Sequence, residues 1–180
     1  LERKKAIARH ATTFLEGGES IYIDGSTTCG ELAKLLNPSK NFTVITDSLY
    51  VLLELSKNRN IELLLLGGVL DKDGNTFDGI LTVDNAKKVM VDYCFFSAKG
   101  FSESYIGNNA MTGSQVKQLM IHNSHRCFLL ADSTKYRKPG IIKLCTWQDV
   151  EVLITDDGLN GDAAEKIKGN NTDVFIAPLE

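Results

Sequence analysis

The stretch Ser20-Ile-Tyr-Ile-Asp-Gly-Ser-Thr-Thr-Cys-Gly-Glu31 joins a short apolar run to a turn rich in small and hydroxylic residues. The apolar run predicts a buried β-strand over Ser20–Asp24. The pattern Thr28-x-x-Glu31 predicts a capping box at the start of a helix over Thr28–Leu36. A strand that passes through one glycine into a helix is typical of a parallel sheet with crossover helices, so this stretch favours an α/β fold.

The same alternation of short apolar runs and helical periods continues to the end of the chain. Further strands are predicted over Phe42–Thr46, Ile61–Gly67, Val91–Ala98, Cys127–Asp132, Val150–Thr155 and Val174–Ala177. Further helices are predicted over Glu2–Leu15, Ser48–Ser56, Val83–Val89, Ser114–Ser124 and Gly161–Lys168. No linker or repeat divides this pattern, so we expect one α/β domain over residues 1–180, with a mainly parallel, open, Rossmann-like sheet and helices on both faces.

Composition narrows the function classes. The chain has 180 residues, and 20 Lys and Arg against 23 Asp and Glu give a net charge of −3. This balance argues against direct nucleic-acid binding, which requires a basic face. No segment approaches the roughly 18 apolar residues of a membrane span. The four cysteines form no C-x-x-C pair and mostly lie in apolar runs, so we expect reduced core residues of a cytoplasmic protein: Cys29, Cys94, Cys127 and Cys145.

Small, hydroxylic or charged residues follow five of the predicted strands. In open parallel sheets the ligand crevice lies beyond the carboxyl ends of the strands, so these residues are candidates for ligand binding. A cation on the helix over Ser114–Ser124, Lys117, joins them. The strand-end candidates are Asp24, Gly25, Ser26, Thr27, Thr28, Thr46, Asp47, Ser48, Gly67, Gly68, Lys99, Gly100, Asp132 and Lys135.

The turn Gly25-Ser-Thr-Thr28 is the most specific of these candidates. Free backbone N–H groups and the helix dipole would receive an anion such as phosphate, and three hydroxyl groups would add donors. The alternative is that these residues only cap the helix. Neither the Walker spacing nor G-x-G-x-x-G is present, which argues against nucleoside triphosphates and dinucleotides.

The segment Asp132-Ser-Thr-Lys135 places a carboxylate and an ammonium three residues apart. In a helical turn both would reach one ligand, and the cation would complete a phosphate site. The alternative is a local surface ion pair. The glycine-rich segment Ile106–Gly113 before Lys117 is either a lid or a long surface loop.

Metal and hydrolase chemistry have little support. His122 and His125 are three residues apart at a predicted helix end, but no third ligand stands out near them. A G-x-S-x-G elbow is absent, so a Ser/His/Asp hydrolase is not favoured. We therefore expect no metal, no cofactor and no catalytic residue.

The opening helix carries Arg3, Lys4, Lys5 and Arg9 beside an apolar stripe and ends at Gly17-Gly18. These basic residues form either a solvated face or part of a connector from an N-terminal domain.

Seven segments carry a resemblance to a known family: Lys4–Leu36, Thr46-Asp-Ser48, Leu63–Gly68, Val91–Gly100, Val116–Ile121, Leu129–Lys135 and Ile154-Thr-Asp156. Taken in this order, they resemble the C-terminal effector-sensing domain of DeoR-type bacterial transcriptional regulators. The match covers nearly the whole chain, and the ordered set is more specific than any single motif.

The resemblance implies a fold like that of ribose-5-phosphate isomerase and a phosphorylated sugar as the effector. It also implies an N-terminal winged helix-turn-helix domain, absent from this chain, through which alone operator DNA would be bound, and a homodimer or homotetramer. The family's phosphate-binding loop falls on Gly25 to Thr28, and its D-x-x-K element falls on Asp132 and Lys135.

Two departures from the family pattern matter for function. The usual T-N-S turn contains Asp47 here, whose charge would favour sugar hydroxyls but repel a nearby phosphate. Glutamates that family members often carry before the helix of Lys117 are missing, and no Asp or Glu occurs from Gly107 to Met120. An aldose–ketose isomerase needs a general base, which the related isomerase takes from a glutamate, so binding without turnover is favoured. A sugar-phosphate isomerase and an interaction domain with a degenerate pocket remain as alternatives.

Overall fold

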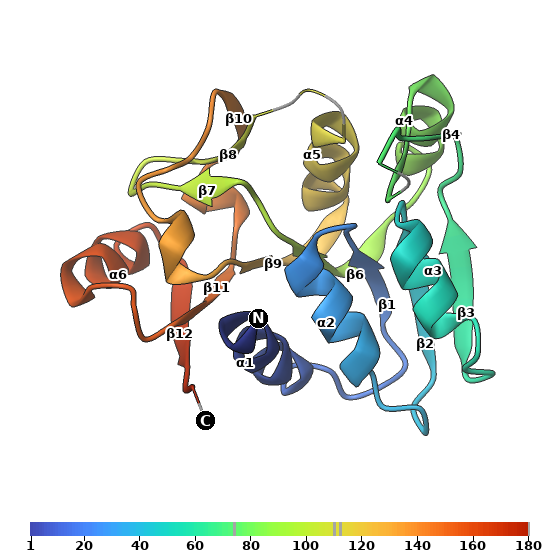
Figure 1. The fold of residues 1–180 in the computed structure, drawn as a ribbon, viewed down its shortest axis with the longest axis horizontal. Helices are drawn as coiled ribbons and strands as arrows, with labels where there is room; N and C mark the ends of the chain where they lie inside the picture. Colours follow the sequence, from blue (N-terminus) through green and yellow to red (C-terminus); the bar gives the residue numbers. More distant parts are fainter. Residues whose placement is uncertain (74, 110, 112, 180) are drawn as a thin grey trace.

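The computed structural model describes residues 1–73, 75–109, 111 and 113–179. Its centre is a seven-stranded parallel sheet with the strand order β12-β11-β9-β6-β1-β2-β3 (Figure 1). The predicted α/β fold with a mainly parallel open sheet is confirmed. The strands of this sheet are β1 (Ser20–Ile23), β2 (Phe42–Thr46), β3 (Ile61–Leu65), β6 (Val91–Phe96), β9 (Ser124–Leu130), β11 (Val152–Asp156) and β12 (Asp173–Ala177).

Shorter strands that the sequence analysis does not predict form two small antiparallel units. A three-stranded sheet has the order β10-β8-β7, and β4 pairs with β5 in a hairpin. These strands are β4 (Val69–Leu70), β5 (Phe77–Asp78), β7 (Gly100–Phe101), β8 (Ile106–Asn108) and β10 (Ile142–Cys145).

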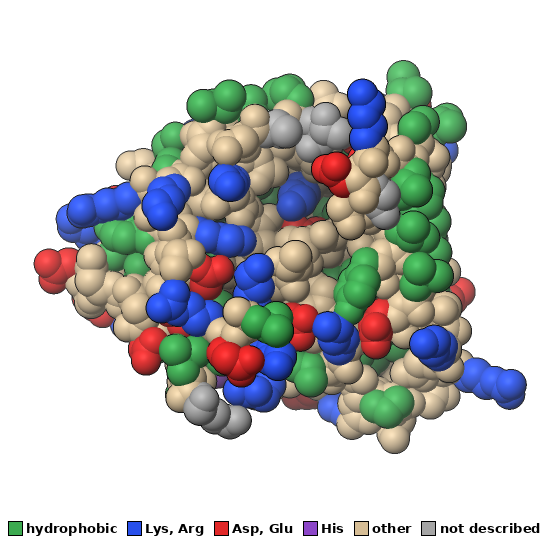
Figure 2. All heavy atoms as spheres, in the orientation of Figure 1, with side chains coloured by type: hydrophobic (Ala, Val, Ile, Leu, Met, Phe, Trp, Pro, Cys, Tyr) green, Lys and Arg blue, Asp and Glu red, His purple; other side chains and the backbone are tan. Residues whose placement is uncertain are grey.

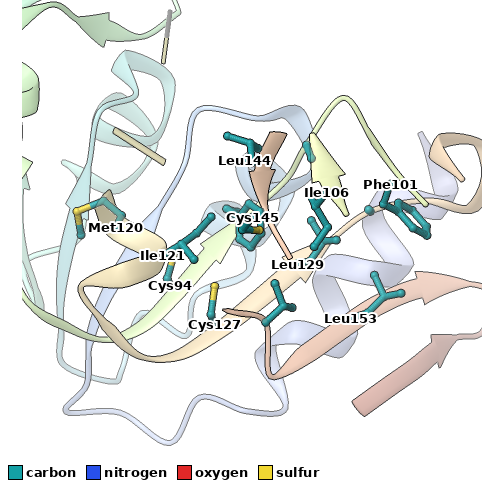
Figure 3. Close-up of a cluster of buried hydrophobic side chains, with 14 of the residues drawn as sticks. Cys94, Phe101, Ile106, Met120, Ile121, Cys127, Leu129, Leu144, Cys145 and Leu153 are labelled. Atoms are coloured by element: carbon teal, nitrogen blue, oxygen red, sulfur yellow. The ribbon is translucent and has the colours of Figure 1, made fainter. Parts of the chain in front are cut away.

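Helices cover both faces of the central sheet, and each face has its own core. One core joins the sheet to α1, α2 and α3, and the other joins it to α4, α5, α6 and the small sheet. Figure 3 shows the part of the second core where residues of the central sheet, α5 and the small sheet pack together. Side chains of a strand alternate between the two faces, so Ile21 enters the first core and Tyr22 the second. The helices are α1 (Glu2–Thr12), α2 (Thr27–Leu35), α3 (Leu49–Leu55), α4 (Ile80–Ala86), α5 (Ser114–His122) and α6 (Gly161–Lys168), with 3-10 turns η1 (Ser133–Lys135) and η2 (Trp147–Asp149).

Several predicted boundaries are wrong. Helix α2 begins one residue early, because the Ser26 hydroxyl accepts from the Cys29 N–H and caps it, so Thr28 and Glu31 form no capping box at its start. Helix α4 begins three residues early, at Ile80, after Gly79 with φ of 98°. Helix α5 ends at His122 and β9 begins at Ser124.

The structure tests the predictions about the four cysteines and about His122 and His125. All four cysteines are free and buried, as predicted. His125 lies in β9 rather than at a helix end, so it does not share a helix face with His122. Among the described residues, no cluster of three or more His, Cys, Asp and Glu side chains could hold a metal ion, and no helix has the length and apolar character of a membrane span.

Candidate functional site

Strands β9, β6, β1 and β2 are neighbours in the sheet, so the residues that follow them meet at one edge. Asp24 follows β1, Asp47 follows β2, Ser97 follows β6 and Asp132 lies just beyond β9. Figure 2 shows a hollow on this side of the molecule, with basic and acidic side chains on its floor and around its rim. The sheet topology thus brings residues from distant parts of the chain to one place.

A buried ion pair between Asp24 and Lys117 lies at the centre of this edge. Lys117 Nζ is 2.8 Å from Asp24 Oδ2 and also donates to the Ser97 carbonyl at 3.1 Å. The backbone N–H groups of Ser97 and Ser26 each donate to the Asp24 carboxylate at 2.9 Å. Burial raises the pKa of Asp24, but Lys117 and these donors outweigh it and hold the pKa below its ordinary value. Asp24 is therefore ionised and fixed in place.

Lys135 approaches the same centre from η1. Its Nζ donates to Ser97 Oγ and to the Ala98 carbonyl, each at 2.8 Å, and burial lowers its pKa. Asp132, the partner in the alternative of a local ion pair, caps η1 by accepting from the Thr134 N–H at 3.1 Å, and its negative charge opposes the effect of burial on the pKa of Lys135. An ammonium has three N–H donors, so two bonds leave Lys135 one donor for a ligand.

Asp47 is the second buried carboxyl group at this edge. Its Oδ1 accepts a 3.1 Å hydrogen bond from the Tyr22 hydroxyl. Burial and the nearby negative charge of Asp24 raise the pKa of Asp47 to about 7, against the opposing effect of Lys117. The residues beside it support the backbone: Thr46 Oγ1 donates to the Ile23 carbonyl, and Ser48 caps α3 by accepting from the Val51 N–H.

The loop from Gly25 to Thr28 carries the N-terminus of α2. Ser26 caps the helix, the Thr27 hydroxyl is exposed and accepts from Lys4 Nζ at 2.7 Å, and Thr28 Oγ1 is buried with no hydrogen-bond partner among the described residues. A methyl group on Gly25 would lie 2.2 Å from Thr76 Cγ2, so the β4–β5 loop packs directly on this turn. The structure therefore presents the free N–H groups of α2 beside an otherwise unpaired hydroxyl.

The structure shows the surroundings of the remaining candidate residues, which are three glycines and Lys99. A methyl group on Gly68 would lie 2.0 Å from Thr82 Oγ1, and one on Gly100 would lie 2.0 Å from the Lys138 carbonyl. Gly67 has φ of 69°, which favours glycine. Lys99 is exposed, and its backbone N–H donates to Asn108 Oδ1 at 2.9 Å. Close packing thus accounts for Gly68 and Gly100 without a ligand.

Only part of the segment predicted as a lid or a surface loop can be described. Ile106–Asn108 form β8, and the Gly113 N–H donates to Asp78 Oδ2 at 2.9 Å. Residues 110 and 112 lie outside the described residues.

Comparison with known proteins assigns this architecture to a family. The model of the DeoR C-terminal sensor domain matches residues 1–157. The chain belongs to the DeoR sensor-domain family. It is 33% identical, over 98% of its length and 70% of the relative's, to the HTH-type transcriptional regulator GolR of Listeria innocua. It is 29% identical, over 95% of its length and 68% of the relative's, to the lactose phosphotransferase system repressor of Lactococcus lactis.

Solved structures confirm the expected fold of this DeoR sensor domain. Ribose 5-phosphate isomerase A of Methanocaldococcus jannaschii superposes with a TM-score of 0.54 at 17% identity, over 75% of this chain and 54% of that chain. The beta subunit of eIF2B from Chaetomium thermophilum gives 0.55 at 15% identity, over 84% of this chain and 48% of that chain. At these identities the likeness shows the fold alone, whereas the family match shows a ligand-sensing domain of a transcriptional regulator.

Three residues that organise the edge of this DeoR sensor domain are not among the predicted site residues. Ser97 bonds to Asp24, Lys117 and Lys135 at once, and Tyr22 bonds to Asp47. Lys4 reaches the loop of α2 from the opening helix. Ser97 stood at a predicted strand end, which was a usable signal; the positions of Lys4 and Tyr22 depend on packing that no local pattern encodes.

Proposed function

We propose that this DeoR sensor domain binds a phosphorylated sugar at the carboxyl edge of β1, β2, β6 and β9. One observation carries the proposal: the free N-terminus of α2, a partly unused ammonium at Lys135 and two buried carboxyl groups converge at a single edge. Helix N-termini and lysines bind phosphate, whereas carboxylates accept bonds from sugar hydroxyls. The names of relatives agree with this, since they include a lactose phosphotransferase system repressor and an aga operon repressor.

Each group has a distinct role in this proposal. The loop of Ser26, Thr27 and Thr28 holds the phosphate with Lys135. Asp24, Asp47, Lys99 and Asp132 bind hydroxyl groups, and Lys117 keeps Asp24 ionised and oriented. Because Asp47 lies beyond β2 rather than on the α2 loop, the proposal assigns its carboxyl group to the sugar and the α2 loop to the phosphate.

The domain is proposed to bind its effector without turning it over. Gly107–Met120 contains no carboxylate, and Asp24 is held by Lys117 and two backbone donors. One observation favours the alternative of a sugar-phosphate isomerase: the pKa of Asp47, at about 7, suits a general base. A coupled ketose–aldose assay distinguishes the two, and turnover that Asp47→Asn abolishes would support the isomerase.

Family membership supports a regulatory role, which we propose as follows. Residues 1–180 act as the sensor for an N-terminal winged helix-turn-helix domain in the bacterial cytoplasm, and the effector shifts the population of arrangements of a homodimer or homotetramer. Such a shift requires that the effector bind one arrangement more tightly than the other. Contact with operator DNA is assigned to the winged helix-turn-helix domain, since the sensor domain itself has a net charge of −3.

Thermal unfolding tests the proposal against a panel of pentose and hexose monophosphates, each paired with its parent sugar. A phosphosugar at about 100 times its Kd should stabilise the domain by roughly 2.7 kcal/mol, which raises Tm by several degrees at this size. A shift with one phosphosugar and none with its parent sugar supports the anion site. Absence of any shift across the panel contradicts it and favours the interaction domain.

Lys135→Ala is expected to weaken phosphosugar binding by roughly 1.5–3 kcal/mol, because a charge-assisted bond is lost. Calorimetric titration measures this loss. Lys138→Ala is the matched control, because Lys138 is an exposed lysine three residues further along. Equal affinities for the two variants would remove Lys135 from the site.

A further inference from the structure

The first turn of α1 contacts one of the loops that are proposed to hold the phosphate directly and is linked to the other through Asp156. Lys4 Nζ donates to Thr27 Oγ1 at 2.7 Å, at the N-terminus of α2. Arg3 Nε lies 3.3 Å from Asp156 Oδ1. Asp156 in turn accepts from the N–H and the hydroxyl of Ser133, each at 2.7 Å, and Ser133 begins the turn that carries Lys135. Helix α1 is therefore attached to both sides of the site.

The environment of Lys4 differs from that of its neighbours on the same helix. Arg3 pairs with Asp156, and Lys5 lies 3.3 Å from Glu2 Oε1. Within the described part of the chain, Lys4 makes no ion pair, and its ammonium is held by a neutral hydroxyl group. Two of its three N–H donors are thus left for other acceptors, beside a helix N-terminus that itself favours an anion.

A second observation points to a ligand at this place. Thr28 Oγ1, on the first turn of α2, is fully buried and lacks a hydrogen-bond partner among the described residues. Buried hydroxyl groups are rarely left without a partner in folded proteins. The loop that Lys4 contacts therefore carries a hydroxyl group whose hydrogen-bonding capacity the described residues do not satisfy.

We propose that Lys4 is a direct ligand of the effector's phosphate, so that the anion bridges α1 and α2. This inference rests on the proposed function. The ammonium exchanges a neutral hydroxyl for a charged acceptor, and bonds between two charged groups are shorter and stronger than bonds to neutral ones. Binding of the phosphate then stabilises the first turn of α1. This turn contains the hydrogen bond that the Lys5 N–H donates to the Leu1 carbonyl at 3.2 Å.

Affinity measurements on matched variants test the direct contact. The probes are inorganic phosphate and the phosphosugar that gives the largest shift in the panel, titrated into the wild-type chain and into Lys4→Ala, Lys4→Met, Lys4→Arg and Lys5→Ala. We expect Lys4→Ala and Lys4→Met to weaken phosphosugar binding by about tenfold or more and Lys4→Arg to restore part of it. Lys5→Ala should change it by less than about twofold, because Lys5 pairs with exposed Glu2.

Hydrogen exchange tests the attachment of α1. The phosphosugar should slow exchange of the Lys5 amide in the wild type and not in Lys4→Met. Equal affinities for Lys4→Met and Lys5→Ala would overturn the inference while leaving the proposed function standing, since the wild type still binds. A wild type that binds no phosphosugar would overturn both. A loss of affinity in Lys4→Met that comes with a lower Tm of the protein alone than that of Lys5→Ala would show a structural role for Lys4 and overturn the direct contact.

Discussion

Asp47 shows how burial and a neighbouring charge together decide the state of one residue. Its carboxyl group is almost fully buried, shares the edge with ionised Asp24 and accepts from the Tyr22 hydroxyl. Desolvation and repulsion by Asp24 both disfavour its charged form, and they raise its pKa to about 7. At neutral pH the folded domain therefore holds Asp47 partly protonated.

A pH dependence of stability follows, and its sign can be worked out. Since the folded pKa is raised above the unfolded value of 3.8, the folded state binds more protons between these values. The contribution of protonated Asp47 to the free energy of unfolding is fully present below pH 3.8 and is lost as the pH rises towards about 7. Asp47→Asn should remove this loss, which amounts to roughly 1 kcal/mol per pH unit within the window.

Urea unfolding at several pH values checks the effect of Asp47→Asn. We expect the variant to gain stability relative to the wild type as the pH rises from 5 to 7, on the order of 1–3 kcal/mol in total. Asp157→Asn, at an exposed position, is the control and should follow the wild-type curve. Parallel curves for Asp47→Asn and the wild type would show that Asp47 is ionised throughout.

At the scale of elements, the α2 N-terminus depends on a hairpin from elsewhere in the chain. The Phe77 N–H donates to the Asp47 carbonyl at 2.7 Å, and Thr76 bridges to Ser48 and packs on Gly25. The β4–β5 hairpin therefore lies against the turns that follow β1 and β2. A side chain at Gly25 would displace it.

Gly25→Ala should destabilise the domain by about 1–3 kcal/mol, because its methyl group would lie 2.2 Å from Thr76 Cγ2. It should also weaken phosphosugar binding, since the α2 loop must shift. Gly161→Ala, at the first residue of α6 with open space around it, is the control and should be neutral or stabilising by up to about 1 kcal/mol. Chemical unfolding measures the stability of the two variants. An unchanged midpoint for Gly25→Ala would show that the hairpin moves to admit the methyl group at little cost in stability.

Elements with a long apolar period were predictable from the sequence. Short strands, and the start of a helix whose apolar residues are exposed, were not. All seven parallel strands and six helices were expected, because each buries an apolar run or stripe. The small strands have two to four residues, too few for a period to show. The start of α4 was missed because Ile80 and Leu81 are 77% and 63% exposed, so the apolar pattern there does not mark the buried face.

Some residues of the candidate site were likewise predictable from the sequence, and others were not. Residues at strand ends were predictable because the parallel topology gathers them, and Ser26 to Thr28 stand at the start of a helix. The pairing of Asp24 with Lys117 was not predictable, since it joins β1 to α5 across the sheet edge. Lys4 was visible only as one of several basic residues, because its position depends on how α1 packs beside α2.

At the scale of the whole molecule, apolar side chains remain exposed along one side. They gather where α3, α4, β4 and the edge strand β3 lie, on the right of Figure 2. Monomeric proteins rarely expose large contiguous apolar patches, and an unpaired edge strand offers free N–H and C=O groups beside this one. The exposed residues are Leu53, Leu64, Val69, Leu70, Ile80 and Leu81.

We propose that a second copy of the chain covers this surface, because an apolar patch placed around a two-fold axis is complementary to itself. Ile80→Lys combined with Leu81→Lys should convert a wild-type dimer into monomers, or a wild-type tetramer into dimers, measured by sedimentation velocity at micromolar concentration. Ile141→Lys, at an 84% exposed position before β10, is the control and should leave the assembly intact. Since both double-variant positions are exposed, the fold should survive, and phosphosugar binding should persist if each site lies within one chain. A wild type that sediments as a monomer would contradict self-association, and an assembly unaffected by the double variant would place the interface on another face.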